Sequence, residues 1–290
     1  MEATHDLDGR TLSVRALRKA LRRGRHEGMK EAYCVLNPGE PAKGAHHLCA
    51  LAVMTKAPRT GQVKTRLAPP LTPDEAAALN ACFLRDTTNA LSATAMRGKK
   101  SGRNARGVAV YTPIGSEDAY SDLLPPCFDL VPQREGSFGE RLFFATEDLF
   151  KCGFDSVCLI DSDSPTVPAS NFAQAMELLS SPGDRVVLGP TDDGGYYLIG
   201  LKKPHRDLFE RIDWSTERVF QQTIARAQEI GVETKLLPSG YDVDDSTALR
   251  QLCDELLSEN SPVDIAPETR KFLKEIIGRE GRERIWPPEK

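Results

Sequence analysis

The sequence predicts an α/β protein with a mostly parallel sheet and helices on both of its faces. Short apolar runs recur along the chain, beginning with Leu48 to Met54, and such runs are typical of strands buried on both faces. Longer segments with helical periodicity separate many of these runs. Strands that alternate with helices indicate a doubly wound, Rossmann-like sheet, in which ligands bind at the carboxyl ends of the strands.

The expected elements follow one another from residue 48 onward. Strands are expected at residues 48–54, 107–111, 128–131, 156–160, 185–188, 196–201 and 233–237. Helices are expected at residues 73–91, 138–150, 169–179, 216–230 and 246–257. Thr72 suits the N-cap of the first helix, because Pro73 is favoured at the first helical position. Ser215 is the expected cap of the fourth helix, and Gly153 suits the position just past the second.

Three parts are expected along the chain. Residues 1–47 are a basic arm and linker, because eight Lys or Arg and a single Glu lie between Arg10 and Lys30, and residues 37–44 are rich in Pro and Gly. Residues 48–258 are a single α/β domain, and residues 259–290 are a helical tail. The arm is expected to be solvated and partly helical; the alternative is an interaction arm for a partner, an acidic membrane surface or nucleic acid.

Composition and charge narrow the classes of function. With 40% hydrophobic and 28% charged residues the chain has an ordinary globular composition. Its net charge of −4 argues against a general nucleic-acid binder. Seven cysteines without a C-x-x-C pair are typical of a reducing compartment. Because no apolar stretch approaches the roughly 20 residues of a membrane span, and the first residues lack a secretory apolar run, we expect a cytoplasmic protein. Nothing in the sequence specifies an oligomeric state.

A basic loop follows the first expected strand, with the sequence K-A-P-R-T-G-Q-V-K-T-R-L. It carries the side chains of Lys56, Arg59, Lys64 and Arg66. The loop is not a Walker A motif, because Gly61 does not immediately precede the second lysine and the upstream glycine is absent. Such a loop can be an ordinary solvated one. Its cations and backbone N–H groups at the end of a strand nevertheless favour phosphate binding.

Two acidic pairs follow later strands, in L-I-D-S-D-S-P and Y-D-V-D-D. They place Asp161 beside Asp163, and Asp242 beside Asp244, at a spacing of two. Side chains two apart on an extended segment point the same way, and paired hard oxygens suit Mg²⁺ or Mn²⁺. Helix capping is the alternative, and Asp245 is the expected cap of the last predicted helix. If the pairs meet, charges about 4 Å apart repel by roughly 4 kcal/mol at an effective dielectric near 20, and a divalent cation relieves this repulsion.

A third motif, G-P-T-D-D-G-G-Y-Y, joins two expected strands. Its glycines, Gly194 and Gly195, follow Asp193 and let the backbone approach a ligand closely. A β-turn is the alternative, since D-G is common there, but the length, the proline and the paired acids favour a ligand. Further along, Trp214 is expected either to stack on a base or sugar or to pack at the start of a helix.

In this order the motifs resemble a known family. With Q-R-E-G-S-F-G-E-R-L and I-D-W-S-T added, they look like the bacterial glycosyltransferases linked to arsenosugar biosynthesis. That family is related to 2-phospholactate guanylyltransferases and, more distantly, to molybdenum-cofactor guanylyltransferases. The resemblance covers about residues 48–256. It implies a GT-A-like nucleotide-diphospho-sugar transferase fold for the domain at residues 48–258.

The resemblance also implies roles for phosphate- and metal-binding residues. It assigns the basic loop, with Lys64 and Arg66, to the phosphates of the nucleotide. It assigns Asp163 to the metal ion, with Asp242 and Asp244 as further ligands. Mg²⁺ or Mn²⁺ is therefore the expected cofactor.

Further residues are expected near the nucleotide, the sugar or the acceptor. The resemblance places Gly136, Gly139 and Arg141 near the nucleotide or sugar, and the segment from Asp193 through Tyr196 against the sugar or acceptor. The family often has Gly where this chain has Asp161. That aspartate is therefore expected to be either an additional ligand or a group that supports one.

These observations predict a metal-dependent glycosyltransferase that moves a sugar from a nucleotide-diphosphate donor to a small hydroxyl acceptor. The metal ion neutralises the departing diphosphate, with Lys64 and Arg66 assisting. Asp193 is the expected general base. The first alternative is a guanylyltransferase-like nucleotidylyltransferase acting on a phosphorylated small molecule. The second is a non-catalytic nucleotide-binding protein, which would have no need of the clustered carboxylates.

Overall fold

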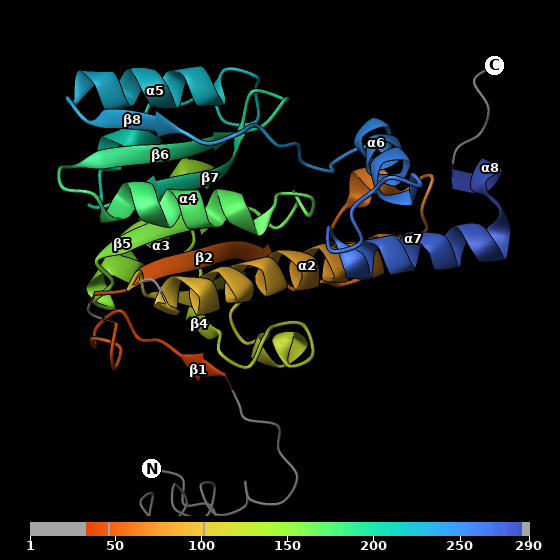
Figure 1. The fold of residues 1–290 in the computed structure, drawn as a ribbon, viewed down its shortest axis with the longest axis horizontal. Helices are drawn as coiled ribbons and strands as arrows, with labels where there is room; N and C mark the ends of the chain where they lie inside the picture. The colour runs from red at the N-terminus through yellow and green to blue at the C-terminus, as the bar shows by residue number, and fades with distance from the viewer. Residues whose placement is uncertain (1–32, 46, 101, 286–290) are drawn as a thin grey trace, which may run out of the picture. The chain divides into compact units, whose positions relative to one another are not determined.

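The computed structural model describes residues 33–45, 47–100 and 102–285, and within them one eight-stranded sheet has the order β1-β4-β3-β2-β5-β7-β6-β8 (Figure 1). The strands are β1 Cys34–Val35, β2 Cys49–Lys56, β3 Ala105–Thr112, β4 Asp129–Pro132, β5 Ser156–Ile160, β6 Arg185–Pro190, β7 Tyr196–Leu201 and β8 Glu233–Leu236. All neighbouring strands are parallel except where β7 pairs with β5 and β6. The expected mostly parallel α/β sheet is confirmed.

Helices cover both faces of this sheet. The α-helices are α2 Pro73–Lys100, α3 Phe138–Lys151, α4 Ala169–Ser180, α5 Val219–Glu229, α6 Ser246–Leu257, α7 Pro267–Glu280 and α8 Arg282–Ile285, and the 3₁₀ helices are η1 Thr65–Leu67, η2 Glu117–Tyr120 and η3 Arg206–Phe209. Alternate residues of β2 face opposite layers. Ala50 belongs to the core that contains Leu142 of α3, whereas Leu51 belongs to the core that contains Leu84 of α2 and Phe172 of α4. Burial on both faces explains why β2 is an uninterrupted apolar run.

A third core lies away from the sheet, among η1, the first half of α2, α6 and α7. Leu67 and Phe83 meet Leu249 and Leu273 there. Val243, which separates Asp242 from Asp244, is fully buried in the same core. This packing holds the segment that follows β8 against the basic loop.

An aspartate on α2 caps helix α7. The carboxylate of Asp86 accepts hydrogen bonds from the backbone N–H groups of Glu268 (3.0 Å) and Thr269 (2.8 Å) at the start of α7. The described residues form one compact unit that begins at Tyr33, and it includes β1 and α7. The expected domain limits at residues 48 and 258 stay predictions, and most of the basic arm lies outside the described residues.

Two helix limits differ from the prediction. Helix α2 continues to Lys100, beyond the expected end at residue 91, because Thr94 is buried and donates a hydrogen bond to the carbonyl of Ala169 at the start of α4. Helix α5 begins at Val219 and not at residue 216. Ser215 has a left-handed backbone with φ 63°, so the expected capping role of Ser215 is wrong.

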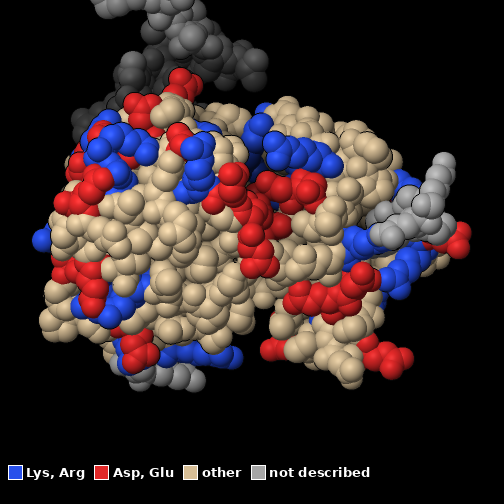
Figure 2. Space-filling view, turned by 90° about the horizontal axis from the view of Figure 1, so that it is seen from above, with Lys and Arg blue, Asp and Glu red and all other residues tan. Residues whose placement is uncertain are grey.

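All seven cysteines lie among the described residues and are free thiols. None of the helices in the part of the chain that the structure describes combines the length and the apolar character that a membrane crossing requires. On the face seen in Figure 2, Asp and Glu side chains gather near the middle, with Lys and Arg side chains beside them. That face therefore presents charges of both signs.

Candidate active site

The strand order reverses between β2 and β5. Strands β3 and β4 lie on one side of β2, and β5 with the strands after it lies on the other. In open α/β sheets, ligands bind outside the carboxyl ends of the strands at such a point. Strand β2 ends at Lys56, where the basic loop begins, and Asp161 follows the last residue of β5. The basic loop and the first acidic pair therefore start at adjacent strand ends.

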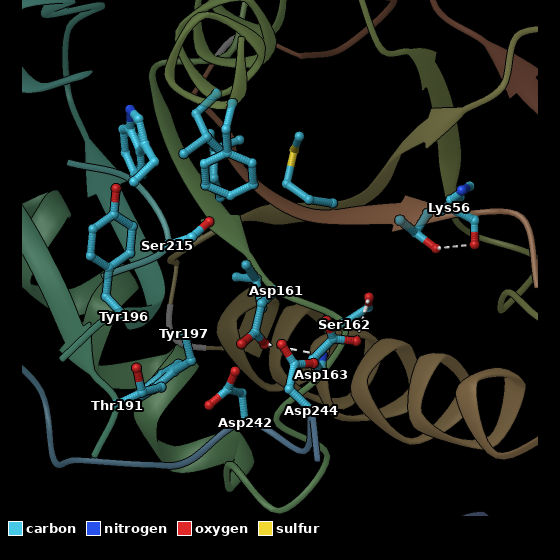
Figure 3. Close-up of a pocket in the computed structure, with 18 of the residues that line it drawn as sticks. Lys56, Asp161, Ser162, Asp163, Thr191, Tyr196, Tyr197, Ser215, Asp242 and Asp244 are labelled. Carbon is cyan, nitrogen blue, oxygen red and sulfur yellow. Dashed lines mark hydrogen bonds between the residues drawn. The ribbon is translucent and has the colours of Figure 1, made fainter. Parts of the chain in front are cut away.

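Backbone hydrogen bonds join the loops that carry the acidic motifs. The N–H of Val243 donates to the carbonyl of Asp163 (2.9 Å), which joins the loop after β5 to the segment after β8. The N–H of Gly240 donates to Pro190 (2.9 Å), and the N–H of Asp192 donates to Gly240 (3.1 Å). The three loops are thus one assembly. Figure 3 shows the carboxylates of both acidic pairs gathered on it.

A cavity of about 780 Å³ opens at this edge of the sheet. Among the residues predicted to be functional, those that line it are Lys56, Lys64, Arg66, Arg141, Asp161, Asp163, Asp193, Gly195, Tyr196, Trp214, Asp242 and Asp244. The others, Arg59, Gly136, Gly139 and Gly194, do not line this cavity. The structure therefore brings together most of the residues that the sequence motifs indicated.

A side chain that binds phosphate is expected to reach into the open cavity, but the side chain of Lys64 does not. Its Nζ lies 2.9 Å from Oδ1 of Asp163 and 2.8 Å from Oδ1 of Asp244, and only 5% of its side chain is exposed. Burial by itself lowers the pKa of Lys64, but the charges of the two carboxylates outweigh that effect and raise it. The ammonium is therefore held in its charged form between two predicted metal ligands.

The surroundings of Asp161 and Asp242 raise the pKa values of their carboxyl groups. Burial, together with the charge of Asp163, raises the pKa of Asp161 well above its usual range. Asp161 also accepts a hydrogen bond from the Ser164 hydroxyl (2.7 Å). Burial, followed by the charges of Asp193 and Asp244, raises the pKa of Asp242 to about 6. Burial and the neighbouring carboxylates thus disfavour the charged forms of both aspartates, and a positive charge placed beside them would stabilise those forms.

Asp193 is fixed by its own turn. Its Oδ1 accepts hydrogen bonds from the Thr191 hydroxyl (2.6 Å) and from the N–H of Gly195 (2.9 Å). The residue is exposed and lines the cavity. A carboxylate fixed in this way beside a cavity is available to a hydroxyl group bound there.

Aromatic and cationic side chains form another wall of the cavity. The rings of Trp214 and Phe138 meet edge to face with centroids 5.0 Å apart, and the Arg141 guanidinium lies 5.4 Å from the Phe138 centroid. Within the part of the chain that the structure describes, Nε of Arg141 is buried and makes no hydrogen bond. This wall can contact an apolar ring face and a negative charge at once.

Two of the predicted glycines have a packing role. A Cβ on Gly139 would lie 2.5 Å from Nε1 of Trp214 and 2.6 Å from the carbonyl oxygen of Phe209. Gly194 has φ +88°, and a Cβ there would lie 2.2 Å from the carbonyl oxygen of Glu217. These two glycines let the backbone lie close to other protein atoms. Trp214, which packs on Gly139, and Gly195, which follows Gly194, are the residues that line the cavity. Gly139 lines a smaller cavity of about 310 Å³, of which Trp214 is also a wall.

The residues fit a divalent cation that arrives with phosphate. Among the described residues, no group of three or more His, Cys, Asp or Glu side chains is placed to hold a metal ion. Four of the carboxylates that line the cavity, those of Asp161, Asp163, Asp242 and Asp244, nevertheless supply the hard oxygens that Mg²⁺ prefers. Mg²⁺ commonly takes one or two protein carboxylates and completes its coordination with substrate phosphates and water. A cage made by protein alone is therefore not needed.

The sequence motifs missed several cavity residues. Thr112 ends β3 and Gln133 directly follows β4, so the rule on strand ends would have found both. Phe138 and Ser215 adjoin predicted motif residues and also line the cavity. Asn80 lies on α2 and is buried, and its sequence context carries no signal of a ligand site.

Comparisons with known proteins find a matching bacterial family profile and a solved structure of the same fold. The profile of a family described as "Uncharacterized protein conserved in bacteria (DUF2064)" matches residues 98–216. A putative nucleotide-diphospho-sugar transferase from Desulfovibrio desulfuricans is 28% identical, with a TM-score of 0.68, over 81% of this chain and 98% of that one. The chain shares that protein's fold. A search of curated proteins gives no match.

Two more distant structures are also similar. One is 4-diphosphocytidyl-2C-methyl-D-erythritol synthase from Anaerococcus prevotii, at 10% identity and a TM-score of 0.47, over 73% of this chain and 96% of that one. The other is glucosyl-3-phosphoglycerate synthase from Mycobacterium tuberculosis, solved with Mn²⁺ and UDP, at 11% identity and a TM-score of 0.39, over 81% of this chain and 80% of that one. The narrower resemblance to arsenosugar-linked enzymes stays a prediction.

Proposed function

We propose that the protein is a metal-dependent transferase that moves a sugar from a nucleotide-diphosphate donor to the hydroxyl group of a small acceptor. One observation carries this proposal: a single cavity at the point where the strand order reverses is lined by Lys56 and Arg66 and also by Asp161 and Asp242. A diphosphate needs cations, and a divalent metal ion needs carboxylates. The fold shared with a putative nucleotide-diphospho-sugar transferase supports the same reaction class.

The basic loop and the carboxylates act on the donor. Lys56 and Arg66 bind the phosphates and stabilise the charge that develops on the departing nucleoside diphosphate. The metal ion would be held within the acidic group that Asp161, Asp163, Asp242 and Asp244 form around the cavity. When bound, Mg²⁺ or Mn²⁺ supplies Lewis-acid neutralisation of the diphosphate.

Other residues that line the cavity bind the sugar and the acceptor. Trp214 offers a ring on which the apolar face of a sugar can stack. Arg141, whose Nε is buried without a hydrogen bond in the described structure, donates to a sugar hydroxyl or to a negative group of a substrate. Asp193 takes the proton from the attacking hydroxyl as its oxygen bonds to the sugar carbon and the bond from that carbon to the nucleoside diphosphate breaks, and this single displacement inverts the carbon.

Nucleotidylyl transfer is the second candidate. Figure 3 shows Lys56 lying apart from the four carboxylates. Lys56 therefore extends the positive charge of the site beyond the acidic group, which suits the longer phosphate chain of a nucleoside triphosphate. In that reaction a phosphorylated small molecule attacks the α-phosphate, and pyrophosphate leaves.

An assay of the released products separates the two candidates. The purified protein is incubated with UDP-, GDP-, ADP- or dTDP-sugars, or with nucleoside triphosphates, in Mg²⁺, Mn²⁺ or EDTA. Metal-dependent release of a nucleoside diphosphate from one sugar donor supports glycosyl transfer. If the protein releases pyrophosphate from a triphosphate and reacts with no nucleotide sugar, the reaction is nucleotidylyl transfer and not glycosyl transfer.

Matched variants test the role of the basic loop. Arg66→Met removes a cation from the cavity wall, and the loss of a hydrogen bond to a charged group, about 1.5–3 kcal/mol, weakens donor binding by roughly ten- to a hundredfold. Arg103→Met is the control, because Arg103 pairs with Glu177 at 3.3 Å and does not line the cavity. If the two variants bind the donor with equal affinity, Arg66 does not bind its phosphates.

A further inference from the structure

Lys64 is a buried cation inside the acidic group. Its Nζ contacts three oxygen atoms, Oδ1 of Asp163 at 2.9 Å, Oδ1 of Asp244 at 2.8 Å and the carbonyl oxygen of Val243 at 2.8 Å. The Phe83 ring lies 5.6 Å from it and closes another side. This set of oxygen atoms around one positive charge resembles the surroundings of a bound metal ion more than those of a lysine that is free to bind phosphate.

The backbone is built to place this ammonium. Lys64 has φ 47° and ψ 39°, a left-handed conformation, at the start of η1. For a residue other than glycine such a conformation costs about 1–3 kcal/mol and persists where surrounding contacts compensate for it. The hydrogen bond from Val243 N–H to Asp163 O (2.9 Å) holds the loops of both carboxylate partners together. The contacts of the lysine are therefore a built feature of the fold.

The ammonium and a metal ion cannot share this place. A divalent cation such as Mg²⁺ binds carboxylate oxygens at about 2.0–2.1 Å, whereas Nζ already lies within hydrogen-bond distance of one oxygen from each of Asp163 and Asp244. An ion that joined those two oxygens would have to displace Lys64. Asp161 and Asp242 line the same cavity, and Nζ makes its two ion pairs with other residues.

We propose that Lys64 is a built-in cation that takes the place of a metal ion between Asp163 and Asp244. The divalent cation of the reaction is thereby confined to the side of Asp161 and Asp242, where phosphate oxygens of the nucleotide must complete its coordination. The second statement rests on the proposed function. The first concerns the protein alone and is tested without any nucleotide.

Removal of the ammonium opens a metal site. In Lys64→Met, a side chain of similar length without charge leaves the partly exposed carboxylates of Asp163 and Asp244 without the cation that lies between them, so that their like charges repel each other. A divalent ion can then occupy the position. The variant is expected to bind Mn²⁺ more tightly than the natural protein and to depend on it for stability.

The experiment is a Mn²⁺ titration of the nucleotide-free protein, in which the electron paramagnetic resonance signal reports the free ion. Lys64→Met is expected to bind Mn²⁺ at least about tenfold more tightly than the natural protein, a difference of about 1.4 kcal/mol. Adding Asp244→Asn to that variant is expected to abolish the gain. In EDTA, Lys64→Met melts below the natural protein, and Mn²⁺ restores its melting temperature.

The charge-conserving variant Lys64→Arg is the matched control and is expected to bind Mn²⁺ as weakly as the natural protein. The proposal is overturned if Lys64→Met gains no affinity for Mn²⁺, or if the gain survives Asp244→Asn. If Lys64→Met does not fold, Lys64→Gln is measured by the same criteria. If the proposed function is wrong, the natural protein responds to no nucleotide sugar in the presence of metal. That result does not affect the comparison of Mn²⁺ affinities.

Discussion

Gly139→Ala tests how the wall of the cavity is built. Gly139 lies in the first turn of α3, where the indole of Trp214 and the carbonyl of Phe209 pack against it. Alanine normally stabilises a helix relative to glycine, by about 0.5–1 kcal/mol. At this position the structure predicts the opposite sign, because the added methyl group has no room.

The magnitude follows from the distances. The new Cβ would lie 2.5 Å from Nε1 of Trp214 and 2.6 Å from the Phe209 oxygen, against 3.4–4 Å for ordinary contact. Overpacking of this kind costs about 1–3 kcal/mol, which exceeds the gain in helix propensity. The difference is a net loss of up to about 2.5 kcal/mol. Since each kcal/mol shifts the melting temperature of a domain of this size by about 2–4 °C, we expect that temperature to fall by up to about 10 °C.

Gly278→Ala is the matched control. Gly278 lies on the exposed face of α7, and nothing lies within 4 Å of its added Cβ. The same substitution there is expected to raise the melting temperature by about 1–4 °C. Thermal unfolding by circular dichroism measures both variants, and titration with the nucleotide-sugar donor reports whether the displaced Trp214 weakens binding. If Gly139→Ala were as stabilising as Gly278→Ala, the described contact with Trp214 would be wrong.

Three further predictions concern stability, pH and catalysis. Asp86→Ala removes the cap of α7 and is expected to cost about 1–2 kcal/mol, measured by urea unfolding; an unchanged midpoint would argue against the cap. A hydrogen bond from Arg284 lowers the pKa of Glu75 to about 2. The stability that this hydrogen bond contributes is therefore fully present above the usual glutamate pKa and is lost as pH falls from there toward about 2. The melting temperature of Glu75→Gln should therefore lie below that of the natural protein at neutral pH, with the gap closing in acid; a gap that is constant with pH contradicts this. Asp193→Asn should bind the donor normally and lose about 10²–10⁴-fold in turnover, and near-normal turnover would exclude its role as base.

Local patterns in the sequence predicted the framework well. The limits of β5, β7 and α6 coincide with the expected ones, because an apolar run flanked by polar residues, or an N-cap such as Asp245, marks each start. The cap is observed, with Asp245 Oδ1 accepting from the N–H groups of Thr247 and Ala248 at 2.9 Å. The gathering of the motifs at one edge followed from the strand-end rule for parallel sheets.

What the sequence did not reveal depends on contacts between distant residues. The antiparallel direction of β7 is not encoded in the alternation of strands and helices, and the extension of α2 depends on burial of Thr94 against α4. Lys64 was expected to bind phosphate, because four cations on one loop are equivalent in a sequence pattern. Only the fold shows that Val243 and Asp244 approach this lysine.

The most direct test of the proposed function is a thermal-shift measurement of the natural protein with UDP-, GDP-, ADP- and dTDP-sugars, each with Mg²⁺, Mn²⁺ or EDTA. A donor at a hundred times its dissociation constant stabilises the folded state by about 2.7 kcal/mol, which corresponds to a rise of roughly 5–10 °C. The proposed function predicts such a rise for one nucleotide sugar in the presence of metal and its loss in EDTA. No response to any nucleotide sugar, with or without metal, would contradict it.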